Sequence, residues 1–240
     1  MAPGSVLPGS LPVLSIAAVT TGDQNPVPPQ GVLPGQLGVI LLGRVVMGDV
    51  AATLADLAAR EAVLTEETPA GGWLVSVNHG FDDHGLAGFE KVLLHDLPRS
   101  PEPIGEIADS VPERVRSALV HDGVARGWLR HLHHDQRTPS AEGLARQLRA
   151  FHRELRQRRQ QNGQDVLSGS LLPYAVHFGL VPVDAVPLAR LAHAWVSAFA
   201  HLPGWRPAAP ARSHDDEPIS ISSDHDLSNA ANLAWAAGLI

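Results

Sequence analysis

The stretch from Leu37 to Val77 constrains the fold more than any other part of the sequence. It opens with a short apolar helix that Gly43 ends, and Arg44–Met47 has the length of a short strand. Asp49 then offers a good N-cap, because its carboxylate can accept an exposed N–H of the helix that follows. The apolar residues of that helix are spaced i, i+4 and i+7 and therefore share one face: Val50, Leu54 and Leu57.

A hairpin is expected after this second helix. Ala62–Glu66 and Trp73–Val77 alternate apolar and polar residues, which is the pattern of half-buried strands. Pro69, Gly71 and Gly72 between them favour a turn. Helix, short strand, helix and hairpin in this order are typical of a winged helix, in which the turn is the wing.

The residues from 85 to 137 repeat this outline in divergent form. Leu86–Leu97 and Ser110–Arg126 are predicted helices, and a Ser-Val-Pro-Glu sequence at the start of the second one favours capping. Trp128–Leu132 can form a strand after it. This order predicts a second, divergent winged helix.

The remainder is predicted to be helical. The longest helix runs from Thr138 to about Gln161, and Leu167–Leu180 and Val186–Leu202 form a closing helical pair. The expected fold class is therefore α+β and helix-rich, with two winged-helix-like modules followed by a helical C-terminal bundle. The expected divisions are a Pro/Gly-rich flexible leader at 1–34, modules at 35–84 and 85–137, the bundle at 138–205, and a flexible tail at 206–240 with a short apolar end at 229–240.

Composition limits the location and the chemistry. The chain has no cysteine, so disulfides and thiolate metal sites are excluded. It lacks an apolar run near the roughly 20 residues of a membrane span, and no basic residue precedes Arg44, unlike in a signal peptide. We therefore expect a cytoplasmic protein. Arginine outnumbers lysine 17 to 1, which is typical of a protein from a GC-rich bacterial genome.

Several short segments resemble one known family. They include GRVVMGDVAATLADLAARE at 43–61, GGWLVSV at 71–77, GLAGFEKVLLHDL at 85–97, ARGWLRH at 125–131, GLARQLRAFHREL at 143–155 and above all LLPYAVHFGL at 171–180. Between about Leu37 and Trp205 the chain resembles the cytosolic region of an uncharacterised family of predicted bacterial and archaeal membrane proteins. The membrane helices and outer domain of that family have no counterpart in this sequence. The resemblance implies a fold and a cytosolic setting, and it implies no catalytic residue.

Nucleic-acid binding is one hypothesis for a winged helix, since such folds contact phosphates through basic side chains. The first module argues against it, because acidic residues surround its would-be recognition helix and wing: Asp49, Asp56, Glu61, Glu66 and Glu67. The second module is more basic, with Arg114, Arg116, Arg126 and Arg130. The net charge of −7 also disfavours nonspecific binding to phosphate by the whole molecule.

The longest helix carries arginines opposite its apolar face. At 100° per residue its apolar residues fall within about 60° of arc. The arginines on the other side are a candidate surface for phosphate, an acidic partner or an anionic membrane: Arg146, Arg149, Arg153 and Arg156. A solvated helix face in an arginine-biased protein is the alternative interpretation.

Metal binding and catalysis have weaker support. Histidine and aspartate cluster at 79–84, 131–135 and 214–226, but ordered spacings such as HEXXH are absent from the sequence. Tyr174 and His177 are spaced i and i+3 and can form a polar pair, although a packed Tyr174 ring with a bonded hydroxyl is favoured. We predict no catalytic residue, metal or cofactor.

The leading hypothesis is a non-enzymatic cytosolic scaffold that binds a protein or peptide. A two-stranded hairpin leaves unpaired backbone groups that can accept an added strand, and Val75 and Trp73 are the expected contact residues. A DNA-binding transcription regulator that uses the second module and the long helix is the alternative. A metal-dependent enzyme built on histidine and aspartate is the third hypothesis.

Overall fold

A computed structural model of the chain describes residues 26–131, 137–162, 169–203 and 205. Within them the chain forms seven α-helices and a small antiparallel sheet, which confirms the helix-rich α+β class. The helices are α1 (Leu37–Leu42), α2 (Met47–Ala59), α3 (Gly88–Asp96), α4 (Ser110–Ala125), α5 (Pro139–Asn162), α6 (Leu172–His177) and α7 (Pro187–Ala198). The strands are β1 (Val63–Glu67), β2 (Trp73–Val77) and β3 (Glu102–Pro103).

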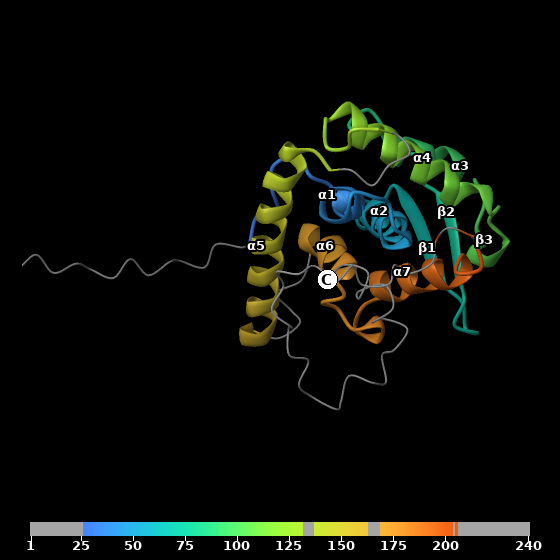
Figure 1. Cartoon of the computed structure of the whole chain (residues 1–240). Helices are drawn as coiled ribbons and strands as arrows, with labels where there is room; N and C mark the ends of the chain where they lie inside the picture. Colours follow the sequence, from blue (N-terminus) through green and yellow to red (C-terminus); the bar gives the residue numbers. More distant parts are fainter. Residues whose placement is uncertain (1–25, 132–136, 163–168, 204, 206–240) are drawn as a thin grey trace, which may run out of the picture.

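The helix α2 lies at the centre of the molecule, with α3 and α4 on one side and α6 and α7 on the other (Figure 1). Its small side chains allow this, because neighbours can approach it closely from several directions. Ala51, Ala52 and Ala55 are all at most 2% exposed. The expected one-sided helix is thus buried around most of its circumference.

The entry to α2 differs from the expectation. Arg44–Met47 is not a strand, since Met47 is the first residue of α2. Asp49 is the third helical residue instead of the N-cap, and its Oδ2 accepts the N–H of Val46 at 2.8 Å. The preceding helix α1 ends as expected at Gly43, whose φ of 75° is the left-handed conformation that favours glycine.

The sheet has the order β1-β2-β3, so β2 is its central strand. The expected hairpin is present, with Val63 opposite Val77 and Glu67 opposite Trp73. The third strand comes from the region assigned to the second module, where Glu102 pairs with Val75. The strand expected at Trp128–Leu132 is reduced to one bridge between Leu129 and Arg137, and residues 132–136 lie outside the described part.

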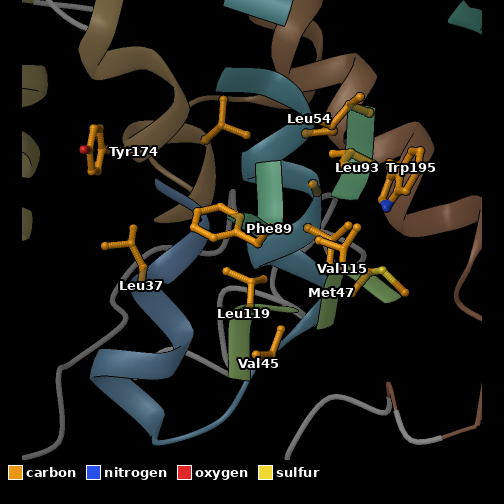
Figure 2. Close-up of a cluster of buried hydrophobic side chains, with 14 of the residues drawn as sticks. Leu37, Val45, Met47, Leu54, Phe89, Leu93, Val115, Leu119, Tyr174 and Trp195 are labelled. Atoms are coloured by element: carbon orange, nitrogen blue, oxygen red, sulfur yellow. The ribbon is translucent and has the colours of Figure 1, made fainter. Parts of the chain in front are cut away.

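One continuous core unites these elements. Figure 2 shows buried side chains of α1, α2, α3, α4, α6 and α7, and of Val45 between α1 and α2, meeting in this core: Leu37, Val45, Met47, Leu54, Phe89, Leu93, Val115, Leu119, Tyr174 and Trp195. The helices α6 and α7 pack mainly on α2, and α5 packs on α1. The segments expected to form two modules and a bundle therefore share one core, and the segments of the two expected modules share one sheet.

The ends of the described chain are packed. Val32 and Trp205 are 3% and 8% exposed, so the last part of the expected leader belongs to the body. The tail at 206–240, including the apolar segment 229–240, lies outside the described residues. Among the helices that are described, none combines the length and the apolar character that crossing a membrane requires.

Candidate binding surfaces and buried polar groups

The expected contact residues Trp73 and Val75 point into the core. Trp73 is 7% exposed and Val75 is fully buried. Val75 pairs with Thr65 on one side and with Glu102 on the other. Its backbone cannot accept a further strand, because β3 already occupies the edge that a two-stranded hairpin would leave open.

The free edge lies instead on β1. The N–H of Thr68 bonds to Gly72 and that of Asn78 bonds to Ala62, which sets the alternation of the ladder. Leu64 and Glu66 therefore direct their backbone groups toward β2. The outward-directed residues have no backbone partner among the residues described: Val63, Thr65 and Glu67.

The side chains along this edge of β1 are partly apolar and partly acidic. Leu64 is 51% exposed, which is unusual among the large hydrophobic residues of the described chain, and it shares the outer face of β1 with exposed Glu66. Arg190 of α7 lies beside the end of the strand and forms an ion pair of 2.7 Å with Glu67. The edge thus presents an apolar side chain next to a carboxylate.

The arginines of the long helix occupy an exposed surface, as the periodicity predicts. Ala145, Leu148, Phe151 and Leu155 on the other side of α5 are buried. We define the α5 arginine face as the exposed residues Arg146, Arg149, Arg153 and Arg156. None of these four forms an ion pair with a carboxylate of the described residues, whereas Arg158 faces Glu154 at 4.0 Å.

The arginines of α4 are engaged differently. Arg114 contacts Asp96 at 2.5 Å, and Arg116 contacts Glu113 at 3.3 Å. Arg126, just after α4, bonds to Asp122 at 3.0 Å and its guanidinium lies 5.1 Å from the ring centre of Trp128. Neighbouring carboxylates therefore neutralise three of the four basic residues that the sequence offered for the second module, while the fourth, Arg130, is exposed.

The histidine and aspartate clusters are only partly described. Asp82, Asp83 and His84 form the one group of three or more such residues in the described chain whose ligand atoms all lie within 4.8 Å of one another, and all three are exposed. The backbone N–H and the ring of His84 lower the pKa of Asp82 by hydrogen bonding. Most of the 131–135 cluster and all of the 214–226 cluster lie outside the described residues.

A buried polar link joins distant parts of the chain. Asp49 and His177 are both fully buried, and His177 Nε2 lies 2.7 Å from Asp49 Oδ1. The same oxygen accepts the N–H of Gly38 at 2.7 Å. The Asp49–His177 link therefore ties α1, α2 and α6 together. Sequence reasoning missed it, because no local pattern pairs residues 128 positions apart.

Tyr174, one helical turn before His177, has the packing role that the sequence favoured. Its hydroxyl donates to the carbonyl of Val32 at 2.6 Å, and its ring meets Phe151 edge to face. Burial, with smaller effects from nearby carboxylates, raises the pKa of Tyr174 above its usual range. The i and i+3 polar pair is not formed, since His177 bonds to Asp49 instead.

A second polar cluster joins α2 to α3. Arg60 contacts Asp56 at 2.7 Å and also contacts Glu90, whose other oxygen accepts the N–H of Ala87 at 2.6 Å. Burial raises the pKa of Asp56 to about 6, and the Arg60 charge only partly offsets this. The cluster places two carboxylates around one guanidinium, which suits a structural contact.

No family model, curated protein or solved structure matches this chain.

Proposed function

We propose that this chain is a non-enzymatic cytosolic scaffold that binds an extended segment of a protein or peptide as a fourth strand. The open edge of β1 is the observation that carries the proposal. The outward backbone groups of Val63, Thr65 and Glu67 form a template for an added strand. The arrangement of α1, α2, β1 and β2 supports a winged-helix-like interpretation of the first module, and the resemblance to cytosolic regions supports the proposed compartment.

The side chains on the edge indicate which peptide fits. In an antiparallel addition the residues opposite Leu64 and Glu66 face them closely without sharing hydrogen bonds. An apolar residue suits exposed Leu64, and a basic residue suits Glu66. The expected ligand is an extended segment with a basic and an apolar residue two positions apart.

A short fluorescent peptide, Thr-Lys-Thr-Val-Thr, tests this in an anisotropy titration. Its central residue would exchange hydrogen bonds with Thr65, so N-methylation there should weaken binding about tenfold, the loss of roughly one well-made hydrogen bond. N-methylation of the lysine or valine should have little effect, because their N–H groups face away from β1. Replacement of the lysine by glutamate should also weaken binding.

The matched protein variant is Thr65→Pro. Proline removes an outward N–H and is tolerated on an edge strand, so the fold should survive while peptide binding is lost. Thr65→Val keeps the N–H and serves as the control. Equal binding by the folded proline variant would refute strand addition.

A DNA-binding regulator is the second candidate, and the α5 arginine face is the observation that favours it. The paired arginines of α4 make it the weaker candidate. A titration of random duplex DNA at low salt is decisive, because phosphate attraction is strongest there. Absence of binding under that condition would end this alternative.

A further inference from the structure

The α5 arginine face is a concentration of positive charge on an acidic chain. Its first and last arginines are ten positions apart in sequence, which is about 15 Å of helix at 1.5 Å per residue. The helix holds six arginines and only two glutamates, while the chain as a whole has a net charge of −7. Like charges at this spacing repel one another, so the surface favours a polyanionic neighbour.

The same chain contains a matching acidic segment. Residues 213–240 include no lysine or arginine, and five carboxylates gather in its first half: Asp215, Asp216, Glu217, Asp224 and Asp226. The two groups of carboxylates are separated by six residues. At about 3.3 Å per residue the seven steps from Glu217 to Asp224 span at most about 23 Å, so the segment is long enough to cover the whole α5 arginine face without being fully extended.

The attachment point allows the segment to reach α5. Trp205 is held on α4, where its Nε1–H donates to Glu113 at 2.6 Å and its ring lies beneath the guanidinium of Arg116. From there an extended chain spans about 30 Å by residue 214 and about 70 Å by residue 226. A body of this size is about 40 Å across, so the acidic residues can reach the far side of the molecule.

We propose that the acidic segment 213–226 binds in cis along the α5 arginine face. Tethering gives the segment a millimolar effective concentration, so even weak charge attraction fills the surface. The bound segment would shield the arginines from other anions. An external polyanion would then have to displace it, which makes the arginine face a regulated surface. This proposal does not depend on strand addition at β1.

The absence of cysteine makes a distance measurement direct. A donor and an acceptor dye are attached to Ala150→Cys on α5 and Ser223→Cys in the acidic segment, and energy transfer is measured in the full chain. Transfer should be high at about 20 mM salt and should fall at 1 M, where the Debye length is about 3 Å. The pair Ala70→Cys and Ser223→Cys reports from the hairpin turn and should not show this fall.

Charge variants assign the effect to the proposed partners. Arg149→Glu with Arg153→Glu, or Asp224→Asn with Asp226→Asn, should reduce transfer at low salt to the value seen at 1 M. Arg130→Glu, an exposed arginine outside α5, is the matched control and should leave transfer unchanged. Energy transfer that changes neither with salt nor in the α5 variants overturns the proposal. Transfer between singly labelled molecules that rises with concentration also overturns it, because the acidic segment would then bind a second copy.

Discussion

At the scale of single residues, Asp49 has the most demanding environment. Its carboxylate is fully buried and accepts bonds from Gly38, Val46 and His177. Asp49→Ala would leave two backbone N–H groups and a buried imidazole without this acceptor. We expect a loss of about 3–5 kcal/mol in the free energy of unfolding, measured by urea denaturation. Asp82→Ala, an exposed aspartate, should change it by less than about 0.5 kcal/mol.

Asp56 makes stability depend on pH. Burial raises its folded pKa from 3.8 to about 6, so the folded state binds the proton more tightly than the unfolded state. Stability from this group is therefore present below about pH 4 and is lost as the pH rises toward 6. Asp56→Asn should gain stability relative to the parent chain across that window, by about 1–3 kcal/mol. Denaturation at several pH values between 4 and 7 measures the difference.

His152 makes stability depend on pH in the opposite direction to Asp56, over the same pH range. Its ring stacks on Phe178, and burial together with the charges of Arg156 and Arg153 lowers its pKa from 6.5 to about 4. The unfolded chain takes up the proton first, so stability is lost as the pH falls from about 6.5 to 4. His152→Gln should show less of this acid loss than the parent chain. A variant that keeps the parent's full acid loss would exclude His152 as the group responsible.

At the scale of elements, the contact between α1 and α2 depends on the absence of a side chain. A Cβ at Gly38 would lie 2.2 Å from Asp49 Oδ2, whereas a Cβ at Gly143 in α5 would meet nothing within 4 Å. Gly38→Ala should therefore lower the thermal midpoint, since both helices would have to separate. Gly143→Ala should raise stability by about 0.5–1 kcal/mol through helix propensity. Equal effects of the two substitutions would contradict this account.

Sequence patterns predict some features of these elements and cannot predict others. The α5 arginine face was predictable, because a period of 3.6 residues places side chains on faces without reference to any partner. The free edge of the sheet was not, because strand order depends on which distant segment pairs. Glu102 and Pro103 carry no strand pattern of their own, yet they turn β2 from an edge strand into a central one.

At the scale of the whole molecule, the shared core predicts a single unfolding transition. Leu54 of α2 and Leu191 of α7 are both fully buried in it. Leu54→Ala and Leu191→Ala should each cost about 2–5 kcal/mol and shift the same cooperative transition. Calorimetry with circular dichroism checks this. Two transitions, each sensitive to only one substitution, would show that the modules unfold independently.

The sequence by itself determined the fold class and most of the helices, because helix periodicity, glycines that end helices and the hairpin turn act over a few residues. It also placed the arginines on one exposed face of α5. The tertiary structure alone decided that α2 is central, that Trp73 and Val75 are internal, and that Asp49 meets His177. These features depend on contacts between segments up to 128 residues apart. Burial and pairing of that kind depend on the whole packing arrangement, which no local pattern contains.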